Sequence, residues 1–540
     1  MSISDAPGDK RIFLRKASGL IRTASGTDTF IYNLGVVSIG LGVGTVLYYG
    51  PAFYPQGNLI IGCMIAGVAM AMISLGFIAW TVTLPRSGGI YVFASRILPP
   101  ALALTLSLVE ITAWLFYCAI AAYWIVTLAL SPMFAALGLL TGSSSFTDLS
   151  KWLLEPWVTF AIGSCILILS GVILSFGMRF FLACNKWVFV LAMASTVFLI
   201  ATLAMGSHEQ FVTNLNGLFS PVMGVADPYN AIIASGKEKG WGTEGFDWWQ
   251  TVLVSNWPFL PLIGAAFSIA IGGEIKSVEK SQTWGMLGAV FIATLVWIVT
   301  IWLALKVFGF EFLGTAVFNT LSANGGLTTP TDPAVALLTG VLTKSPLITF
   351  ITSLGLALWM WMWIPAMHTF GVRAIVAWAF DRVAPAPLAS ISETYHTPVV
   401  AIVVTAIVNI VSMALFVFVP YFSKIVILIE AALLAWSVVL GAGVFFPYLR
   451  PQIYEKSPIA NKRLFGFPLM TVSCFLGFIG SQFFFWTLFL DPTAAGHDPT
   501  QVAIVGGVFV IGLVFYFVMK MIRRAQGVDV TLAFKEIPIE

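Results

Sequence analysis

The chain has 540 residues, of which 59% are hydrophobic and only 9% are charged, whereas a soluble domain usually carries about 25% charged residues. This composition excludes a soluble fold and predicts an all-α integral membrane protein whose surroundings are the lipid bilayer. The formal net charge is +3, and so small an excess does not indicate a nucleic-acid partner.

Twelve apolar stretches are long enough to cross the membrane, because a helix of about 20 residues spans ~30 Å of hydrocarbon. The predicted spans are 28–50, 58–82, 100–136, 156–177, 182–205, 251–273, 284–307, 346–378, 398–419, 424–447, 465–490 and 500–521. Several exceed the minimum length, so we expect tilted helices or extra turns outside the bilayer.

The distribution of Lys and Arg predicts the orientation, since cytoplasmic loops retain these residues. When both termini are placed in the cytoplasm, only six of the 27 basic residues fall on the other side, and these six are Lys151, Lys237, Lys239, Lys306, Lys344 and Lys424. The sequence therefore predicts a multi-pass protein of the cell (plasma) membrane with both termini cytoplasmic.

The order of the spans predicts two repeated units. The predicted segments are a cytoplasmic N-terminal segment at 1–27, helices one to five at 28–205, an extracellular loop at 206–250, helices six to ten at 251–447, helices eleven and twelve at 448–521, and a cytoplasmic tail at 522–540. Five spans per unit make the second unit enter the membrane from the opposite side. This is the pattern of a 5+5 inverted repeat, whose substrate site lies at the midplane.

The first predicted helix is interrupted by glycines between Ser38 and Thr45. Gly40, Gly42 and Gly44 allow the backbone to leave helical geometry, and unpaired backbone groups in a membrane must face protein, water or a ligand. The freed amides and the positive end of the following half-helix would bind a carboxylate. Close helix packing through small residues is the alternative reading, and the glycine spacing alone does not decide between them.

The sixth predicted helix is interrupted as well. Pro258 and Pro261 each remove a backbone hydrogen bond, and Gly264 follows them. The pair Gly272 and Gly273 offers a second weak point. Freed carbonyls at either place could receive an ammonium group, so the two interrupted helices together predict a site for an α-amino acid.

Several motifs resemble those of one transporter family. They are Gly42-Val43-Gly44, the run from Pro85 to Tyr91 with Ser95-Arg96, Phe267-Ser268 followed by Gly272-Gly273-Glu274, and the region from Arg373 through Asp381-Arg382 and Pro385 to Thr397-Pro398. Together they cover about residues 28 to 450, and the chain resembles members of the amino acid–polyamine–organocation (APC) superfamily. This resemblance implies a LeuT-like fold with discontinuous helices 1 and 6, alternating access and an amino acid substrate.

Two registers compete for the break in helix six. The prolines favour a break that ends at Gly264, whereas the family motif favours Ala270 to Gly273. We favour the second register, which places the inner half of the helix after Gly273. The predicted substrate-binding residues are Ser38, Gly40, Gly42, Val43, Gly44, Thr45, Ile263, Gly264, Phe267, Ala270, Ile271, Gly272 and Gly273, with Ile263, Phe267 and Ile271 as an apolar pocket. Trp257 or Phe259 is the candidate outer gate, with ordinary helix packing as the alternative.

No cofactor is predicted, because the five cysteines show no paired spacing. A coupling ion, H+ or Na+, is expected instead. Some proton-coupled relatives carry a lysine in helix five, where this chain has Ser195 followed by Thr196. In helix eight, Ala366 and Thr369 have the spacing by which sodium-coupled relatives supply oxygen ligands. A hydroxyl pair of this kind is also common in any membrane helix.

Four ionisable residues are further candidates for coupling. Glu110, His368 and Glu430 fall inside predicted spans, where ionisable groups default to functional hypotheses. The alternative reading is an ion pair, such as Glu110 with Lys186, or hydrogen bonds that hold helices together. Glu274 would either line the site or pair with a basic group at the cytoplasmic end.

The sequence thus predicts a secondary active transporter of neutral or hydrophobic α-amino acids. The alternative of the same fold is an amine or polyamine carrier, which would need Glu110, Glu274 or Glu430 in its pocket. An intramembrane enzyme is disfavoured because its acid and base candidates are scattered over separate helices. An amino acid sensor of this fold remains a further alternative, and a nucleotide-driven pump is disfavoured because the sequence contains no phosphate-binding loop motif.

Overall fold

The computed structural model describes residues 20–242, 244–321, 326–419, 422, 428–493, 498–527 and 530. Within this part of the chain, 12 helices are long and apolar enough to cross a membrane, which confirms the predicted number. They are Gly26–Phe53, Leu59–Thr83, Pro100–Thr141, Pro156–Ser175, Met178–Met205, Trp248–Ala270, Val278–Phe308, Pro346–Phe380, Val399–Phe418, Leu428–Leu449, Leu469–Leu490 and Pro499–Ala525. Most of the predicted N-terminal segment and of the predicted tail lies outside the described residues.

The helices and strands follow one another in this order: α1 (Gly26–Val37), α2 (Ile39–Phe53), α3 (Leu59–Thr83), α4 (Ile90–Ala94), α5 (Pro100–Trp124), the π-helix η1 (Ile125–Leu130), α6 (Ser131–Thr141), α7 (Ser144–Leu153), α8 (Pro156–Ser175), α9 (Met178–Met205), α10 (His208–Met223), α11 (Pro228–Glu238), α12 (Trp248–Val254), α13 (Asn256–Leu262), the 3₁₀ helices η2 (Ile263–Ala270) and η3 (Gly272–Glu274), α14 (Val278–Phe308), α15 (Phe310–Leu321), α16 (Val335–Thr343), α17 (Pro346–Phe380), the 3₁₀ helix η4 (Ala386–Ala389), α18 (Val399–Phe418), α19 (Leu428–Leu449), α20 (Pro451–Tyr454), β1 (Arg463–Leu464), β2 (Phe467–Pro468), α21 (Leu469–Leu490) and α22 (Pro499–Ala525). The two short strands pair antiparallel.

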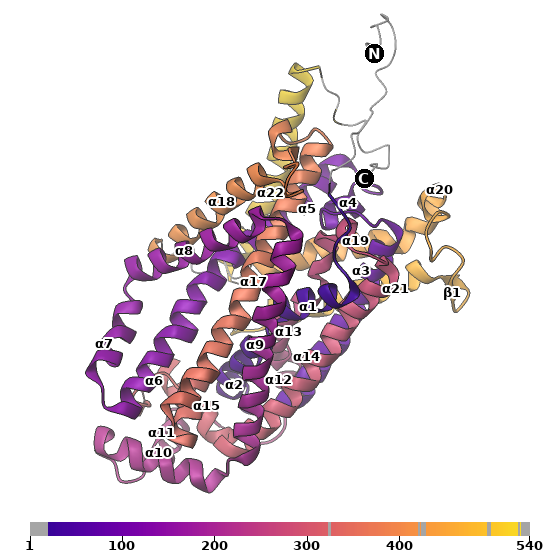
Figure 1. Ribbon diagram of the computed structural model, residues 1–540. Helices are drawn as coiled ribbons and strands as arrows, with labels where there is room; N and C mark the ends of the chain where they lie inside the picture. The colour runs from indigo at the N-terminus through magenta and orange to yellow at the C-terminus, as the bar shows by residue number, and fades with distance from the viewer. Residues whose placement is uncertain are drawn as a thin grey trace, which may run out of the picture.

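Helix α17 forms the centre of the bundle (Figure 1). It begins sharply because the Ser345 hydroxyl accepts a hydrogen bond from the N–H of Ile348, and Pro346 occupies the first turn, where no N–H partner is needed. It packs against α5, α9 and α18, whereas α1 packs against α14 and η2. These contacts place the interrupted helices inside the bundle rather than at its surface.

The outermost helices have the apolar exposure expected of a lipid-facing surface. Helix α22 packs on α5 and leaves Val510 and Ile511 about 60% exposed. In a bilayer such side chains meet acyl chains and not water, so their exposure carries no hydrophobic cost.

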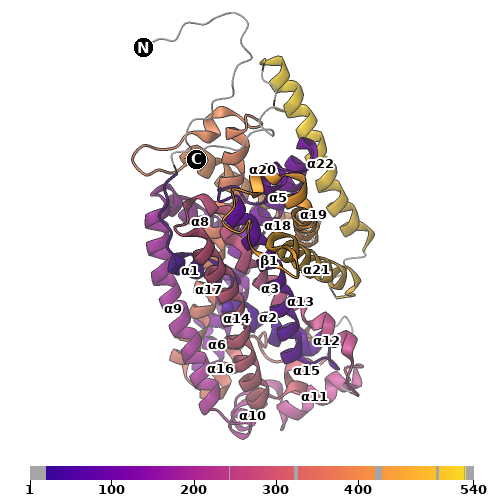
Figure 2. The same cartoon turned by 90° about the vertical axis from the view of Figure 1, so that its right-hand side faces the viewer.

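The two ends of the bundle differ. Helices α10 and α11 lie at one end, and α20 lies at the other (Figures 1 and 2). We call these the α10 end and the α20 end. The two long loops at 206–250 and 309–345 both contain short helices, and α10 from the first contacts α16 from the second. The two loops therefore lie at the same end of the molecule.

Candidate functional site

The first transmembrane helix breaks at Ser38. Helix α1 ends at Val37 and α2 starts at Ile39, while Ser38 itself has φ 51° and ψ 74° in the left-handed region. A non-glycine residue rarely adopts this conformation, and the surrounding structure must impose it. The expectation that Gly40, Gly42 and Gly44 unwind the helix is wrong, because all three are helical residues of α2.

Two of these glycines make room for tryptophan rings instead. A Cβ atom at Gly42 would overlap the indole of Trp297 on α14, and one at Gly40 would lie 2.8 Å from the indole of Trp359 on α17. The Trp297 Nε1–H donates to the carbonyl of Ile39 at 2.9 Å. The glycines thus act through close packing of helices, which was the alternative reading.

The break leaves polar groups without partners inside the protein. The Ser38 side chain is fully buried, and its hydroxyl has no hydrogen-bond partner among the described residues. It stands at the N-terminus of α2, which has no side-chain cap. Such a terminus carries a partial positive charge and free N–H groups, which favour an anion. Trp363 of α17 donates its Nε1–H to the carbonyl of Val36, on the other side of the break.

The sixth span changes helix type at Ile263. Helix α13 contains Pro261 and ends at Leu262, and the chain continues as the 3₁₀ helix η2. The change of helix type begins beside Gly264, as the prolines favour, whereas the chain leaves the helix at Ile271, within the favoured register of Ala270 to Gly273. The inner half does not follow Gly273, because α14 begins at Val278. Pro261 cannot donate an N–H to the carbonyl of Trp257, so the α-helical hydrogen bonding is already interrupted within α13, just before this change of helix type.

The two interrupted helices touch each other. A Cβ atom at Gly264 would lie 2.5 Å from the carbonyl carbon of Val36 and 2.7 Å from its oxygen, so only glycine allows this approach. Asn33 of α1 reinforces the contact: its Nδ2 donates to the Ser268 hydroxyl at 3.0 Å, and its Oδ1 accepts the Ser268 N–H at 2.9 Å. We call the contact of Gly264 with Val36, together with the nearby break at Ser38, the central junction.

The predicted apolar pocket is only partly assembled. Ile263 is buried directly beside Gly264, and Phe267 packs edge-on against Trp114 at 4.8 Å and against Phe370 at 5.2 Å between ring centroids. Ile271 lies elsewhere, paired with Ser87 at the α20 end. Ile271 lies eight residues after Ile263, which is about 16 Å at the rise of a 3₁₀ helix.

A cavity of about 80 Å³ adjoins α2 between the central junction and the α10 end. We call it the Asp332 cavity; it is lined by Leu41, Gly44, Thr45, Tyr48, Tyr49, Leu128, Asp332, Ala334, Val335, Leu356 and Met360. A smaller cavity of about 30 Å³ lies next to it and is lined partly by Gly40, Val43, Ser195 and Thr196. Leu128 of the π-helix η1 lines both, and π-helical turns are frequent at functional sites.

The two gate candidates have different surroundings. Trp257 stacks on Tyr49 with 4.1 Å between ring centroids, and Tyr49 lines the Asp332 cavity. Phe259 is fully buried and stacks on Phe484 of α21 at 3.4 Å. Phe259 therefore takes part in the packing between helices in this conformation, which was the alternative reading.

Four segments meet at the α20 end. A bidentate ion pair joins Arg373 of α17 to Glu274 of η3, with Nε–Oε1 at 2.7 Å and Nη2–Oε2 at 3.0 Å, and both side chains are buried. The N–H groups of Thr23 and Ala24 donate to the carbonyl of Glu274 at 2.9 and 3.0 Å. Of the two readings for Glu274, pairing with a basic group is the one observed.

The loop after α3 completes this contact. Gly88 donates its N–H to the carbonyl of Ala270 at 3.0 Å, and the Ser87 hydroxyl accepts the N–H of Gly273 at 3.2 Å. A Cβ atom at Gly272 would lie 2.8 Å from the Arg86 carbonyl oxygen. We call the contact of Thr23–Ala24, Ser87–Gly88, Ala270–Glu274 and Arg373 the α20-end closure. The predicted substrate residues Ala270, Ile271, Gly272 and Gly273 lie here and not at the central junction.

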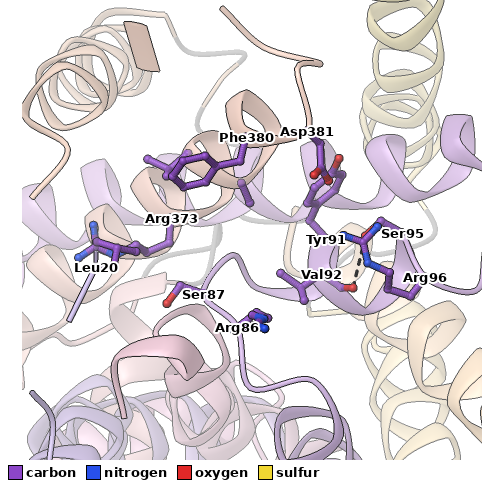
Figure 3. Close-up of a pocket in the computed structure, with 12 residues that line it drawn as sticks. Leu20, Arg86, Ser87, Tyr91, Val92, Ser95, Arg96, Arg373, Phe380 and Asp381 are labelled. Atoms are coloured by element: carbon purple, nitrogen blue, oxygen red, sulfur yellow. Dashed lines mark hydrogen bonds between the residues drawn. The ribbon is translucent and has the colours of Figure 1, made fainter. Parts of the chain in front are cut away.

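Figure 3 shows a small pocket beside this closure. It holds about 20 Å³ and is lined by side chains of α17 and of the segment from Arg86 to Arg96. Arg373 and Ser87 point toward one side, and Tyr91, Arg96 and Asp381 lie on the other (Figure 3). So small a space leaves no room for an amino acid between these charged side chains.

The proposed ion ligands of helices five and eight do not come together. The Ser195 hydroxyl donates to the carbonyl of Ile351 at 2.9 Å, and Thr196 accepts the Trp359 Nε1–H at 2.9 Å. Ala366 lies 15 residues beyond Ile351 on α17, or about 22 Å along the helix axis. A single sodium site built from Ser195, Thr196, Ala366 and Thr369 is therefore wrong. Thr369 donates its hydroxyl to the Pro365 carbonyl at 2.7 Å.

Two of the buried ionisable residues hold helices together. Glu110 Oε1 accepts the Trp436 Nε1–H at 2.7 Å, and its Oε2 accepts the Ile90 N–H at 3.4 Å. The expected pair of Glu110 with Lys186 is wrong, because Lys186 pairs with Asp28 at 2.7 Å. The carboxylate thus connects α5 to α4 and α19.

His368 and Glu430 differ in their bonding. His368 lies 3.3 Å from the Ser170 hydroxyl through Nδ1 and 2.9 Å from the Thr405 hydroxyl through Nε2, which joins α17 to α8 and α18. Glu430 on α19 is 3% exposed, and its Oε1 has no hydrogen-bond partner among the described residues. Of the ionisable candidates, Glu430 is the one with an unsatisfied oxygen.

Sequence reasoning missed several residues around these sites. Asp332 lies in the loop between α15 and α16, and its position directly before Pro333 was the available signal. Tyr48 follows the glycine run by one helical turn. Trp363 carried no signal in the sequence, because tryptophan is common in membrane helices and only the fold brings its indole to Val36.

These features define a polytopic α-helical membrane protein in which two interrupted helices meet inside the bundle. Residues 29–515 match the family model described as amino acid permease. Because the match covers most of the chain, the protein belongs to the amino acid permease family, within the APC superfamily. It is accordingly a membrane transporter and not an enzyme. No curated protein matches the chain.

Proposed function

We propose that this permease is a secondary active transporter of neutral or hydrophobic α-amino acids. The observation that carries the proposal is the central junction, where Gly264 lies against the Val36 carbonyl beside the buried, unpartnered hydroxyl of Ser38. Two helix breaks that meet inside a membrane bundle supply free backbone donors and acceptors at one place.

The junction suits the two charged groups of an α-amino acid. The N-terminus of α2 at Ser38 has the polarity to hold the carboxylate. The ammonium would bind carbonyl oxygens at the end of α1 and at the start of η2, where the change of helix type alters the bonding pattern. The apolar side chains of Ile263 and Phe267 lie next to this place and favour an uncharged side chain.

Alternating access follows from the two ends of the bundle. The α20-end closure blocks one side, and the Asp332 cavity lies toward the other. In our proposal the α20 end is cytoplasmic, so both termini face the cytoplasm of a cell whose plasma membrane holds the protein. Transport would open the closure while the α10 end shuts, by movement of two LeuT-like repeats at 28–205 and 251–447 against each other.

The amine or polyamine carrier receives less support. It needs Glu110, Glu274 or Glu430 in the pocket, and the first two are engaged with Trp436 and Arg373. The coupling ion is proposed to be H+, with Glu430 as its carrier, since its Oε1 has no partner in the described part of the chain. No resident cofactor is proposed.

Thermal unfolding of the detergent-purified protein tests the proposal, because a ligand that binds only the folded state raises the melting temperature. We expect stabilisation by one or more apolar amino acids and a loss of at least tenfold in their affinity in Gly264→Ala. Gly507→Ala is the matched control, since a Cβ atom there meets open space. Stabilisation by polyamines and by no amino acid would contradict the proposal.

A further inference from the structure

The Asp332 cavity has a composition that the central junction does not explain. Among the described residues that line it, Asp332 is the only one with a charged side chain, and the others are apolar, aromatic or hydroxyl-bearing. The Asp332 Oδ1 has no hydrogen-bond partner among the described residues. Tyr48 of α2 lines the same cavity and brings a hydroxyl group to it.

A carboxylate that is removed from water and has no cation beside it is unfavourable, because too few hydrogen bonds and no opposite charge replace its lost hydration. An ammonium group supplies both the opposite charge and hydrogen-bond donors. We propose that Asp332 and Tyr48 form an outer binding site for the ammonium group of the substrate, separate from the central junction. This inference rests on the proposed function.

The surroundings of Asp332 suit an alkylammonium. The rings of Tyr48 and Tyr49 lie 4.9 Å apart between centroids, and aromatic faces attract a cation. The side chains of Leu41, Leu356 and Met360 offer apolar contact to an aliphatic chain on the opposite part of the wall. A ligand held by its ammonium at Asp332 would therefore have its carbon chain directed along α2.

The position along α2 separates this site from the central junction. Gly44 lines the cavity and lies six residues after Ser38, which is about 9 Å along the helix. A substrate entering from the α10 end would meet Asp332 before it reaches the break. The outer site would thus select for a positively charged nitrogen ahead of recognition at the junction.

Titration calorimetry on the full detergent-purified chain tests this site, with n-butylammonium as the probe. Butyrate and butanol, which have the same four-carbon length but no ammonium group, are the control ligands. We expect binding of n-butylammonium and no binding of the other two. Asp332→Asn should raise the Kd at least tenfold, Asp332→Glu should keep it within about threefold, and Tyr48→Phe should retain binding because the carboxylate remains. Asp148→Asn, an exposed carboxylate on α7, is the matched control and should behave as wild type.

A second variant keeps the inference falsifiable if Asp332→Asn unfolds. Gly44→Leu leaves the fold intact because a Cβ atom there meets nothing within 4 Å, and its side chain would fill the cavity and abolish n-butylammonium binding. Wild-type affinity in Gly44→Leu or Asp332→Asn, or no n-butylammonium binding by the wild type, would overturn the inference. If amino acids still stabilise the protein in that case, the proposed function survives; if none does, the proposed function fails independently.

Discussion

At the scale of single residues, the glycines of α2 and η2 control how closely helices approach. Gly42 allows the indole of Trp297 to reach the backbone of Ile39, and Gly264 allows η2 to reach Val36. In both cases the absence of Cβ matters and the backbone angle does not, since Gly42 and Gly264 have ordinary negative φ. A glycine in a membrane helix can thus mark a contact between helices as well as a break.

We expect Gly42→Ala to destabilise the protein by about 1–3 kcal/mol, the usual cost of overpacking a core. Trp297→Phe removes the overlapping ring and should make the alanine less costly, so the two changes should be coupled in a double-mutant cycle of thermal unfolding. Gly44→Ala, at an open position of the same helix, is the control. Additive effects of Gly42→Ala and Trp297→Phe would contradict the packing role.

The pH dependence of the outer site follows from its carboxylate. Burial raises the pKa of Asp332 above the ordinary aspartate value, and the Tyr48 hydroxyl partly offsets this. Tyr48 and Tyr49 are the titratable side chains that face it across the cavity. Ammonium binding needs the charged carboxylate. Binding is therefore expected above the pKa of Asp332 and is expected to be lost as the pH falls through that pKa.

We therefore expect n-butylammonium affinity to fall at a pH above that at which an exposed aspartate titrates. Calorimetry at a series of pH values measures this loss. The weaker affinity that remains in Asp332→Asn should not change with pH over the same range. An affinity of the wild type that does not change with pH would show that another group holds the ammonium.

At the scale of elements, the α20-end closure joins four segments distant in the chain. Its buried ion pair between Glu274 and Arg373 connects η3 to α17, and the backbone N–H groups of Thr23 and Ala24 attach the segment before α1 to the carbonyl of Glu274. Breaking a buried pair by removing one partner costs about 3–5 kcal/mol, because the other charge stays buried and uncompensated. The closed state of this end therefore depends strongly on the pair.

We expect Glu274→Gln to open the α20 end. Val376, which is 2% exposed and lines the adjacent pocket, would report this as Val376→Cys labelled by a membrane-impermeant maleimide. Labelling should rise several-fold in Glu274→Gln and stay near the parent level in Lys462→Gln, which breaks an exposed ion pair instead. Equal labelling in both would mean that the pair does not hold the end shut.

At the scale of the whole molecule, buried polar residues have two different uses. His368 and Glu110 have their polar atoms in hydrogen bonds that connect neighbouring helices, which agrees with the alternative that these residues hold helices together. Glu430 retains an oxygen without a partner in the described part of the chain. A transporter that changes conformation can use such an unsatisfied group to take up a proton, whereas an engaged group would first have to break its contacts.

We expect Glu430→Gln to abolish the pH dependence of amino acid uptake into proteoliposomes. Glu110→Gln should keep that dependence and lower the melting temperature, since the amide cannot accept the same bonds from Trp436 and Ile90. Uptake measured over a pH series with an imposed proton gradient separates the two variants. If uptake by Glu110→Gln does not depend on pH and uptake by Glu430→Gln keeps the wild-type pH dependence, the proton carrier is Glu110 and not Glu430.

The sequence by itself determined the membrane class, the 12 spans and the positions of the two interrupted helices, because apolar length, glycine and proline act locally along the chain. It did not determine where the first helix breaks, because the left-handed residue is Ser38, or that the sixth span changes to a 3₁₀ helix at Ile263 before it ends at Ala270. It also could not pair Glu274 with Arg373 or bring Asp332 beside Tyr48. Those contacts join residues far apart in sequence, and only the packing of the helices, decided by tertiary structure, brings them within bonding distance.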